Sequence, residues 1–157
     1  MIFLESWSKP LLFLHLLAAV AATATSWHLL VRFVIKVRGR RGLLRLVRLH
    51  ALILLIAYSA AFLLGAIIYP TFRVRVRHEY LDQAVPLATA LFEVKEHLAA
   101  LMLPVVLLLF VQSRVLHFRD PEDRRYIPLF FCLVCVIAGV LSFNAWCGWW
   151  LSSLRSL

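Results

Sequence analysis

Charged residues are scarce in this sequence, and acidic ones are scarcest. Only 16% of the 157 residues are charged and 8 are Asp or Glu, whereas 63% are hydrophobic. One soluble core of this length cannot hide so much apolar surface, so lipid must cover the rest. The net charge of +9 is concentrated between apolar runs, which is typical of membrane loops rather than of a nucleic-acid-binding domain. The composition predicts a single membrane domain and argues against a nucleic-acid partner.

Motifs of soluble enzymes are also missing: we find no nucleotide-binding loop, catalytic triad or hydrolytic metal site. Cys132 and Cys135 form a CxxC pair, but no second pair and no nearby histidine complete a zinc site. We interpret both as small packing residues of an apolar helix. Whether the chain is an enzyme is left open, and an electron-transfer component fits better than a stand-alone catalyst.

Four apolar stretches reach the length of about 20 residues that crosses a hydrocarbon core about 30 Å thick. They span residues 10–35, 46–69, 89–111 and 126–151. The first is not expected to be a cleavable signal, because its positive charges follow the apolar run instead of preceding it. The sequence therefore predicts an all-α fold, an antiparallel bundle of four membrane helices with no soluble domain.

The orientation follows from the basic residues of the connections. Ten lie on one side: Lys36, Arg38, Arg40, Arg41, Arg45, Arg48, Arg114, Arg119, Arg124 and Arg125. Five lie on the other: Lys9, Arg73, Arg75, Arg77 and Arg155. The richer side is expected in the cytoplasm, so both termini are predicted to face outward. An aromatic belt at the outer surface agrees with this orientation; its members are Trp7, Trp146, Trp149 and Trp150.

Four histidines fall within the apolar stretches, where ionisable residues are costly and typically line a functional site. From the helical rise, His28 lies about 7 Å and His50 about 12 Å from the bilayer centre on the cytoplasmic side. Two imidazoles at similar depth on facing helices can hold a b-type haem. Arg32 lies one turn below His28, near Arg45 and Arg48, and these cations can bind haem propionates.

The other two histidines, His15 and His97, lie about 12 Å and about 4 Å from the centre on the outer side. They form a second candidate haem pair, with propionate partners among Arg73, Arg75, Arg77 and Lys95. His15 and His28 are about 140° apart around their helix and are therefore expected to face different neighbours. One or two haems are possible, and interfacial histidines without a cofactor are the alternative.

Small residues that allow close helix approach are concentrated on the first two helices. The first helix offers Ala18, Ala22 and the run 23–26, and the second offers Ala61 and Gly65. We interpret these positions as interface faces of the bundle, against which a flat molecule could also fit.

Glu93, Glu96 and His97 share one face of the third helix by their i, i+3, i+4 spacing. Such a group can carry protons, bind a quinone head group or ligate a metal. A dinuclear iron site would need a matching Glu-x-x-His on another helix, and the chain has none. If the helix begins near Pro86, a favourable first-turn residue, these charges can instead be solvated at the outer interface.

Residues 69–80 alternate apolar and basic side chains with period two. In an extended segment, this alternation places Arg73, Arg75 and Arg77 on one edge and the apolar residues on the other. We expect these arginines to contact lipid phosphates, an acidic partner or the carboxylates of a cofactor.

Two segments, YPTFRVRVR at 69–77 and FEVKEH at 92–97, together with His15 and His28, resemble a family of small uncharacterised four-helix bacterial membrane proteins. The resemblance implies the architecture and a location in the bacterial inner membrane, but no activity. The layered histidines also look like those of small membrane b-type cytochromes, which implies haem.

Taken together, these features predict a haem-binding electron-transfer protein or subunit of a membrane. Its expected partners are the lipid bilayer, other subunits of a redox complex or further copies of the chain, and a quinone. The alternatives are a cofactor-free accessory subunit of a larger membrane complex, or a small metal-handling or transport protein that uses Glu93, Glu96 and His97.

Overall fold

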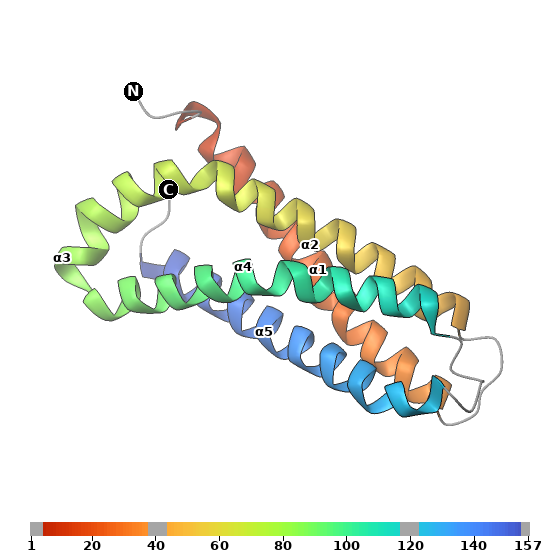
Figure 1. Ribbon diagram of the computed structural model, residues 1–157. Helices are drawn as coiled ribbons and strands as arrows, with labels where there is room; N and C mark the ends of the chain where they lie inside the picture. Colours follow the sequence, from red (N-terminus) through yellow and green to blue (C-terminus); the bar gives the residue numbers. More distant parts are fainter. Residues whose placement is uncertain (1–4, 38–43, 117–122, 155–157) are drawn as a thin grey trace.

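The computed structural model describes residues 5–37, 44–116 and 123–154, and all regular structure in these ranges is helical (Figure 1). The four long helices are α1 (Ser8–Val37), α2 (Leu44–Phe72), α4 (Pro86–Val115) and α5 (Ile127–Leu154). The short elements are η1 (Glu5–Trp7), the π-helix η2 (Arg73–Leu81), α3 (Asp82–Ala84) and η3 (Asp123–Tyr126). The expected all-α fold with four long helices is confirmed; α1, α2 and α4 extend beyond both predicted limits, whereas α5 extends only at its C-terminal end.

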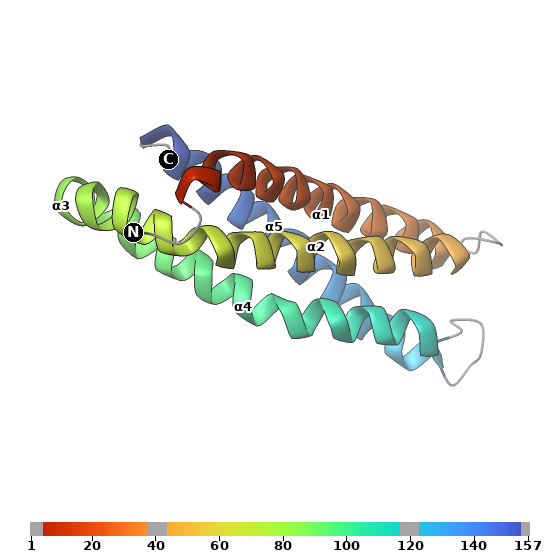
Figure 2. The same cartoon turned by 90° about the horizontal axis from the view of Figure 1, so that it is seen from above.

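The four long helices form an antiparallel bundle in which each helix has two neighbours. The neighbouring pairs are α1 with α2, α1 with α5, α2 with α4, and α4 with α5. Consequently α1 faces α4 across the bundle, and α2 faces α5 (Figures 1 and 2). The start of α1, the end of α5 and the turn from α2 to α4 lie at one end, which we call the terminal end (Figure 1).

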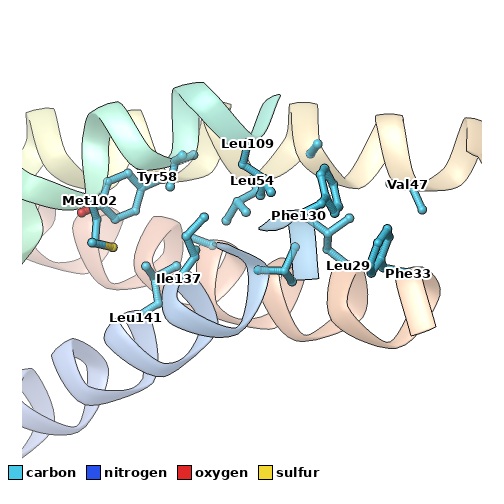
Figure 3. Close-up of a cluster of buried hydrophobic side chains, with 14 of the residues drawn as sticks. Leu29, Phe33, Val47, Leu54, Tyr58, Met102, Leu109, Phe130, Ile137 and Leu141 are labelled. Carbon is cyan, nitrogen blue, oxygen red and sulfur yellow. The ribbon is translucent and has the colours of Figure 1, made fainter. Parts of the chain in front are cut away.

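The main core fills the half of the bundle away from the terminal end, and all four helices contribute to it (Figure 3). Leu29, Leu54, Leu109 and Phe130 are fully buried there. The rings of Phe33 and Phe130 pack 4.6 Å apart. Moving an apolar side chain from lipid into the bundle gains little hydrophobic free energy, because both environments are apolar. Close van der Waals packing of this kind therefore holds the helices together.

The outside of the bundle is apolar along its whole length. Phe13, Leu63 and Leu101 are each 61% exposed, which a monomeric protein in water would not display over so large an area. All four long helices are long and apolar enough to cross a membrane. The architecture is that of a multi-pass membrane protein.

The prediction of an extended segment at residues 69–80 is wrong. Helix α2 continues through Pro70 to Phe72, and Arg73–Leu81 then forms a π-helix. Pro70 has no N–H to continue the α-helical hydrogen-bond ladder, and the π-helix that follows is a rare form, found mostly as a local irregularity of α-helices. Val76 is 1% exposed whereas Val74 is 40% exposed, so the two valines do not share an edge.

Candidate functional site: an interhelical cavity

A cavity of about 440 Å³ lies between the four long helices, on the terminal side of the main core. It separates that core from a smaller buried cluster around Val76, Leu81 and Phe92. Much of its wall consists of small residues: Ala19 and Ala22 of α1, Ala61, Gly65 and Ala66 of α2, Ala99 and Ala100 of α4, and Ala145 of α5. Aromatic rings form another part of the wall: Tyr58, Phe62, Tyr69, Phe72 and Phe92. The predicted small-residue faces of the first two helices therefore border this cavity.

His15 lines the cavity from α1. Its Nδ1–H donates a hydrogen bond of 2.8 Å to the carbonyl oxygen of Ala61 on α2. Because a carbonyl can only accept, Nδ1 carries the proton, and the Nε2 of the neutral ring keeps a lone pair. A Cβ at Gly65 would lie only 3.2 Å from Cε1 of His15, so glycine at this position lets the imidazole reach the α2 backbone.

Lys95 and Glu96 line the cavity from α4, the helix that faces α1 across the bundle. The Lys95 Nζ lies 5.6 Å from the centroid of the Phe92 ring. The same Nζ would be 3.7 Å from a Cβ at Gly148, so this side chain reaches toward α5. The wall opposite His15 therefore contains a lysine and a glutamate.

Tyr58 and Asn144 are further polar residues of the lining. The hydroxyl of Tyr58 donates a hydrogen bond of 2.6 Å to the carbonyl of Ala99 and so ties α2 to α4. Asn144 of α5 has a buried Oδ1 with no hydrogen-bond partner in the described part of the chain. A buried acceptor of this kind is costly unless a ligand or water supplies the missing donor.

An ion-pair clasp, formed by Arg77, Asp82 and Glu93, lies at the terminal end. Arg77 forms ion pairs with Glu93 and, at 3.6 Å, with Asp82. Thr89 donates a hydrogen bond of 2.8 Å to the same Asp82 carboxylate. The clasp joins η2, α3 and α4 and so fixes the turn beside the cavity.

The predicted stripe on the third helix is divided between three environments. Glu93 belongs to the clasp, and Glu96 lines the cavity. His97 is exposed outside the cavity wall, and its Nδ1–H donates to the carbonyl of Glu93 within α4. The helix begins at Pro86, which is the start expected under the alternative that these charges are solvated at the outer interface.

The predicted inner pair, His28 and His50, comes together with ring centroids 6.1 Å apart and planes tilted by 46°. The Nδ1–H of His50 donates to the carbonyl of Leu46, 2.7 Å away. His28 is exposed, and Leu29 and Leu54 near the pair are fully buried. The pair thus lies on the flank of the α1–α2 interface and does not line the cavity.

His15 and His28 both contact α2, so the expectation that they face different neighbours is wrong. His15 meets Ala61, whereas His28 meets His50. Two residues 140° apart around α1 can both reach α2, because the two helices are in contact along much of their length. Each histidine touches a different flank of the α1–α2 interface.

The remaining predicted residues lie away from the cavity. Arg32, Arg73 and Arg75 are exposed, and Arg75 forms an ion pair of 3.2 Å with Glu79 on its own helix. Within the described ranges, no group of three or more His, Cys, Asp or Glu side chains is arranged to hold a metal ion.

Comparison with protein-family models, with curated proteins and with solved structures finds no match to this chain. The geometry of the cavity is therefore the basis for inferring a function.

Lys95, Tyr58 and Asn144 are the lining residues that the sequence did not identify as one site. Lys95 is expected from the sequence only as a propionate partner, and neither Tyr58 nor Asn144 is singled out. Their signal is present in retrospect, because each is a polar residue inside an apolar run. Such residues in a membrane helix are typically functional.

Proposed function

We propose that this chain is a membrane electron-transfer component that binds a lipid-soluble redox carrier of the quinone class in the interhelical cavity. The observation that carries the proposal is the convergence of His15, Lys95 and Glu96 on one cavity within an apolar bundle. Ionisable groups at this depth are expensive to maintain and mark functional sites by default.

The size and lining of the cavity support this ligand class. Small-molecule sites are typically clefts of about 300–1,000 Å³ with apolar walls and a few placed polar groups, and the cavity has about 440 Å³. A quinone offers a flat ring for the alanine and aromatic walls and oxygens for the polar groups. The cavity is partly open, so an apolar tail can extend into lipid.

In this proposal, the protein lies in the bacterial inner membrane with both termini outside, and the cavity lies in the outer half of the bilayer. The support for this orientation is the basic excess of the connections opposite the termini, which the positive-inside rule assigns to the cytoplasm.

The test is to identify the molecules that copurify with the protein in nanodiscs formed directly from its membrane. Ala99→Leu adds bulk to the cavity wall, whereas Ala90→Leu adds the same bulk to an exposed position of α4 outside the wall. Mass spectrometry should find a quinone with the wild type and Ala90→Leu, and much less with Ala99→Leu. Equal amounts in all three samples, or none in the wild type, would contradict the proposal.

A second candidate is a b-type haem held by His28 and His50, which the 6.1 Å separation of their rings favours. His28 and His50 would hold the iron through their imidazoles, and the haem would supply one-electron transfer. Arg32 and Arg45 are exposed near the pair and would be the partners of the propionates, whereas Arg48 donates hydrogen bonds to the carbonyl oxygens of Ser113 and Arg114. We rank the quinone ahead of the haem because of the packing of Leu29 and Leu54. A haem between the two rings would have to displace these side chains or lie on the lipid side of the pair.

Reduced-minus-oxidised absorbance of the purified protein tests the haem candidate. His28→Ala and His50→Ala should remove the same spectral component, because each would remove one of the two imidazoles that would hold the haem. His78→Ala, at an exposed position of η2, is the control. An unchanged haem spectrum in both test variants would exclude this pair as ligands.

A further inference from the structure

His15, Lys95 and Glu96 lie on two walls of the cavity that face each other. His15 lies on α1, and Lys95 and Glu96 lie on α4, and these helices are opposite each other in the bundle. Aromatic rings of α2 line the cavity between them. A ligand that satisfies both walls must carry a polar atom at each end of an apolar ring.

The two walls also differ in hydrogen-bonding character. The proton of His15 is already donated to Ala61, so Nε2 can only accept, and it requires an O–H on the ligand. The opposite wall offers the ammonium of Lys95 and the carboxylate of Glu96, so it can bind either a hydroxyl or a carbonyl oxygen.

From these contacts, and resting on the proposed function, we infer that the cavity binds a ring with two oxygens in para positions. One ligand hydroxyl donates to Nε2 of His15, and the other oxygen meets Lys95 and Glu96. The cavity therefore selects the quinol form over the quinone, because a quinone carbonyl would face the lone pair of Nε2. A site built to bond a hydroxyl discriminates strongly against an analogue that lacks it.

This selection has a measurable consequence for the redox couple. A protein that binds the quinol more tightly than the quinone raises the midpoint potential of the bound couple. For a two-electron couple, a tenfold preference corresponds to a rise of about 30 mV.

The test compares three probes of nearly equal size on the full chain in nanodiscs: duroquinol, duroquinone and tetramethylphenol, which has one hydroxyl. Loss of a buried hydrogen-bond partner costs about tenfold or more in affinity. The wild type should therefore bind duroquinol at least tenfold more tightly than either of the other probes. This comparison does not depend on the folding of any variant.

Variants with matched controls test which residues bind each end of the ligand. His15→Phe should weaken duroquinol binding about tenfold and abolish the preference over duroquinone, whereas His97→Phe, outside the cavity wall, should change neither. Glu96→Gln should weaken duroquinol binding, and Glu79→Gln, on exposed η2, should not.

The outcomes separate this inference from the proposed function. Equal affinity of the wild type for duroquinol and tetramethylphenol would overturn binding at both ends and leave the cavity as a quinone site. Equal affinity for duroquinol and duroquinone would overturn the selection of the reduced form. Failure of the wild type to bind any probe would overturn the proposed function itself.

Discussion

Replacing Gly65 by alanine tests the geometry on which the site depends. A methyl group at this position would lie 3.2 Å from Cε1 and 3.3 Å from Nδ1 of His15, so the ring must move by a few tenths of an ångström. The 2.8 Å hydrogen bond to Ala61 would then weaken. Interhelical hydrogen bonds in membranes contribute about 0.6 kcal/mol on average and up to about 1.7 kcal/mol.

Gly139 provides the matched control, because a methyl group there would meet nothing within 4 Å. Both substitutions gain the higher helix propensity of alanine, up to about 1 kcal/mol in an exposed helix. We therefore expect Gly139→Ala to stabilise the protein, and Gly65→Ala to fall short of it by about 1 kcal/mol. The free energy of unfolding can be measured in mixed micelles by titration with dodecyl sulfate and circular dichroism.

The same displacement moves Nε2 of His15, so duroquinol affinity should fall with Gly65→Ala and remain unchanged with Gly139→Ala. Equal stabilisation by the two alanines, with unchanged affinity in both, would refute the close contact between Gly65 and His15.

Three further predictions concern the ties of the bundle and its orientation. Tyr58→Phe removes the hydrogen bond to the Ala99 carbonyl and should lower the free energy of unfolding by about 0.6–1.7 kcal/mol. Tyr126→Phe, at an exposed ring, should change this free energy little. Equal effects of the two substitutions would argue against a stabilising bond between Tyr58 and Ala99. Arg77→Gln removes the ion pairs of the partly exposed clasp and should lower the free energy of unfolding by about 1 kcal/mol or less. Amide hydrogen exchange in η2 should become faster. In a chain without its native cysteines, Arg75→Cys should react with a membrane-impermeant reagent in intact spheroplasts and Arg40→Cys should not; the reverse pattern would invert the orientation.

The four helices were predictable because length and hydropathy alone decide them. A stretch of about 20 apolar residues has few alternatives to a membrane helix. The ends extend further than predicted because helices continue beyond the hydrocarbon core, where Pro86 can begin a helix and Arg114 can remain near its end.

The π-helix could not be predicted from alternation. A period of two along residues 73–77 fits a strand, but a strand there would leave backbone groups unpaired beside the membrane, which is costly. The helical conformation satisfies these groups locally. It also allows Arg77 to pair with Asp82, a near neighbour along the chain, and with Glu93, which lies so much further along that the spacing gives no signal.

For the site, the sequence gives depth but not rotation about the helix axis. The estimated depths correctly predicted that His28 and His50 lie close to each other. It could not show that His15 lines a cavity while His97 is exposed, because a small error in helix phase turns a side chain from the bundle interior to lipid. Lys95 illustrates the same limit: it is not part of the predicted stripe of Glu93, Glu96 and His97, yet it lines the cavity with Glu96.

The most direct test of the central claim is photoaffinity labelling with an azidoquinone, followed by mass-spectrometric mapping of the labelled residues. The account predicts labels on cavity residues such as Phe62, Tyr69 and Phe92, and their loss when excess duroquinol competes. Labels confined to exposed residues such as Leu63 and Leu101, or labels that duroquinol does not displace, would contradict it.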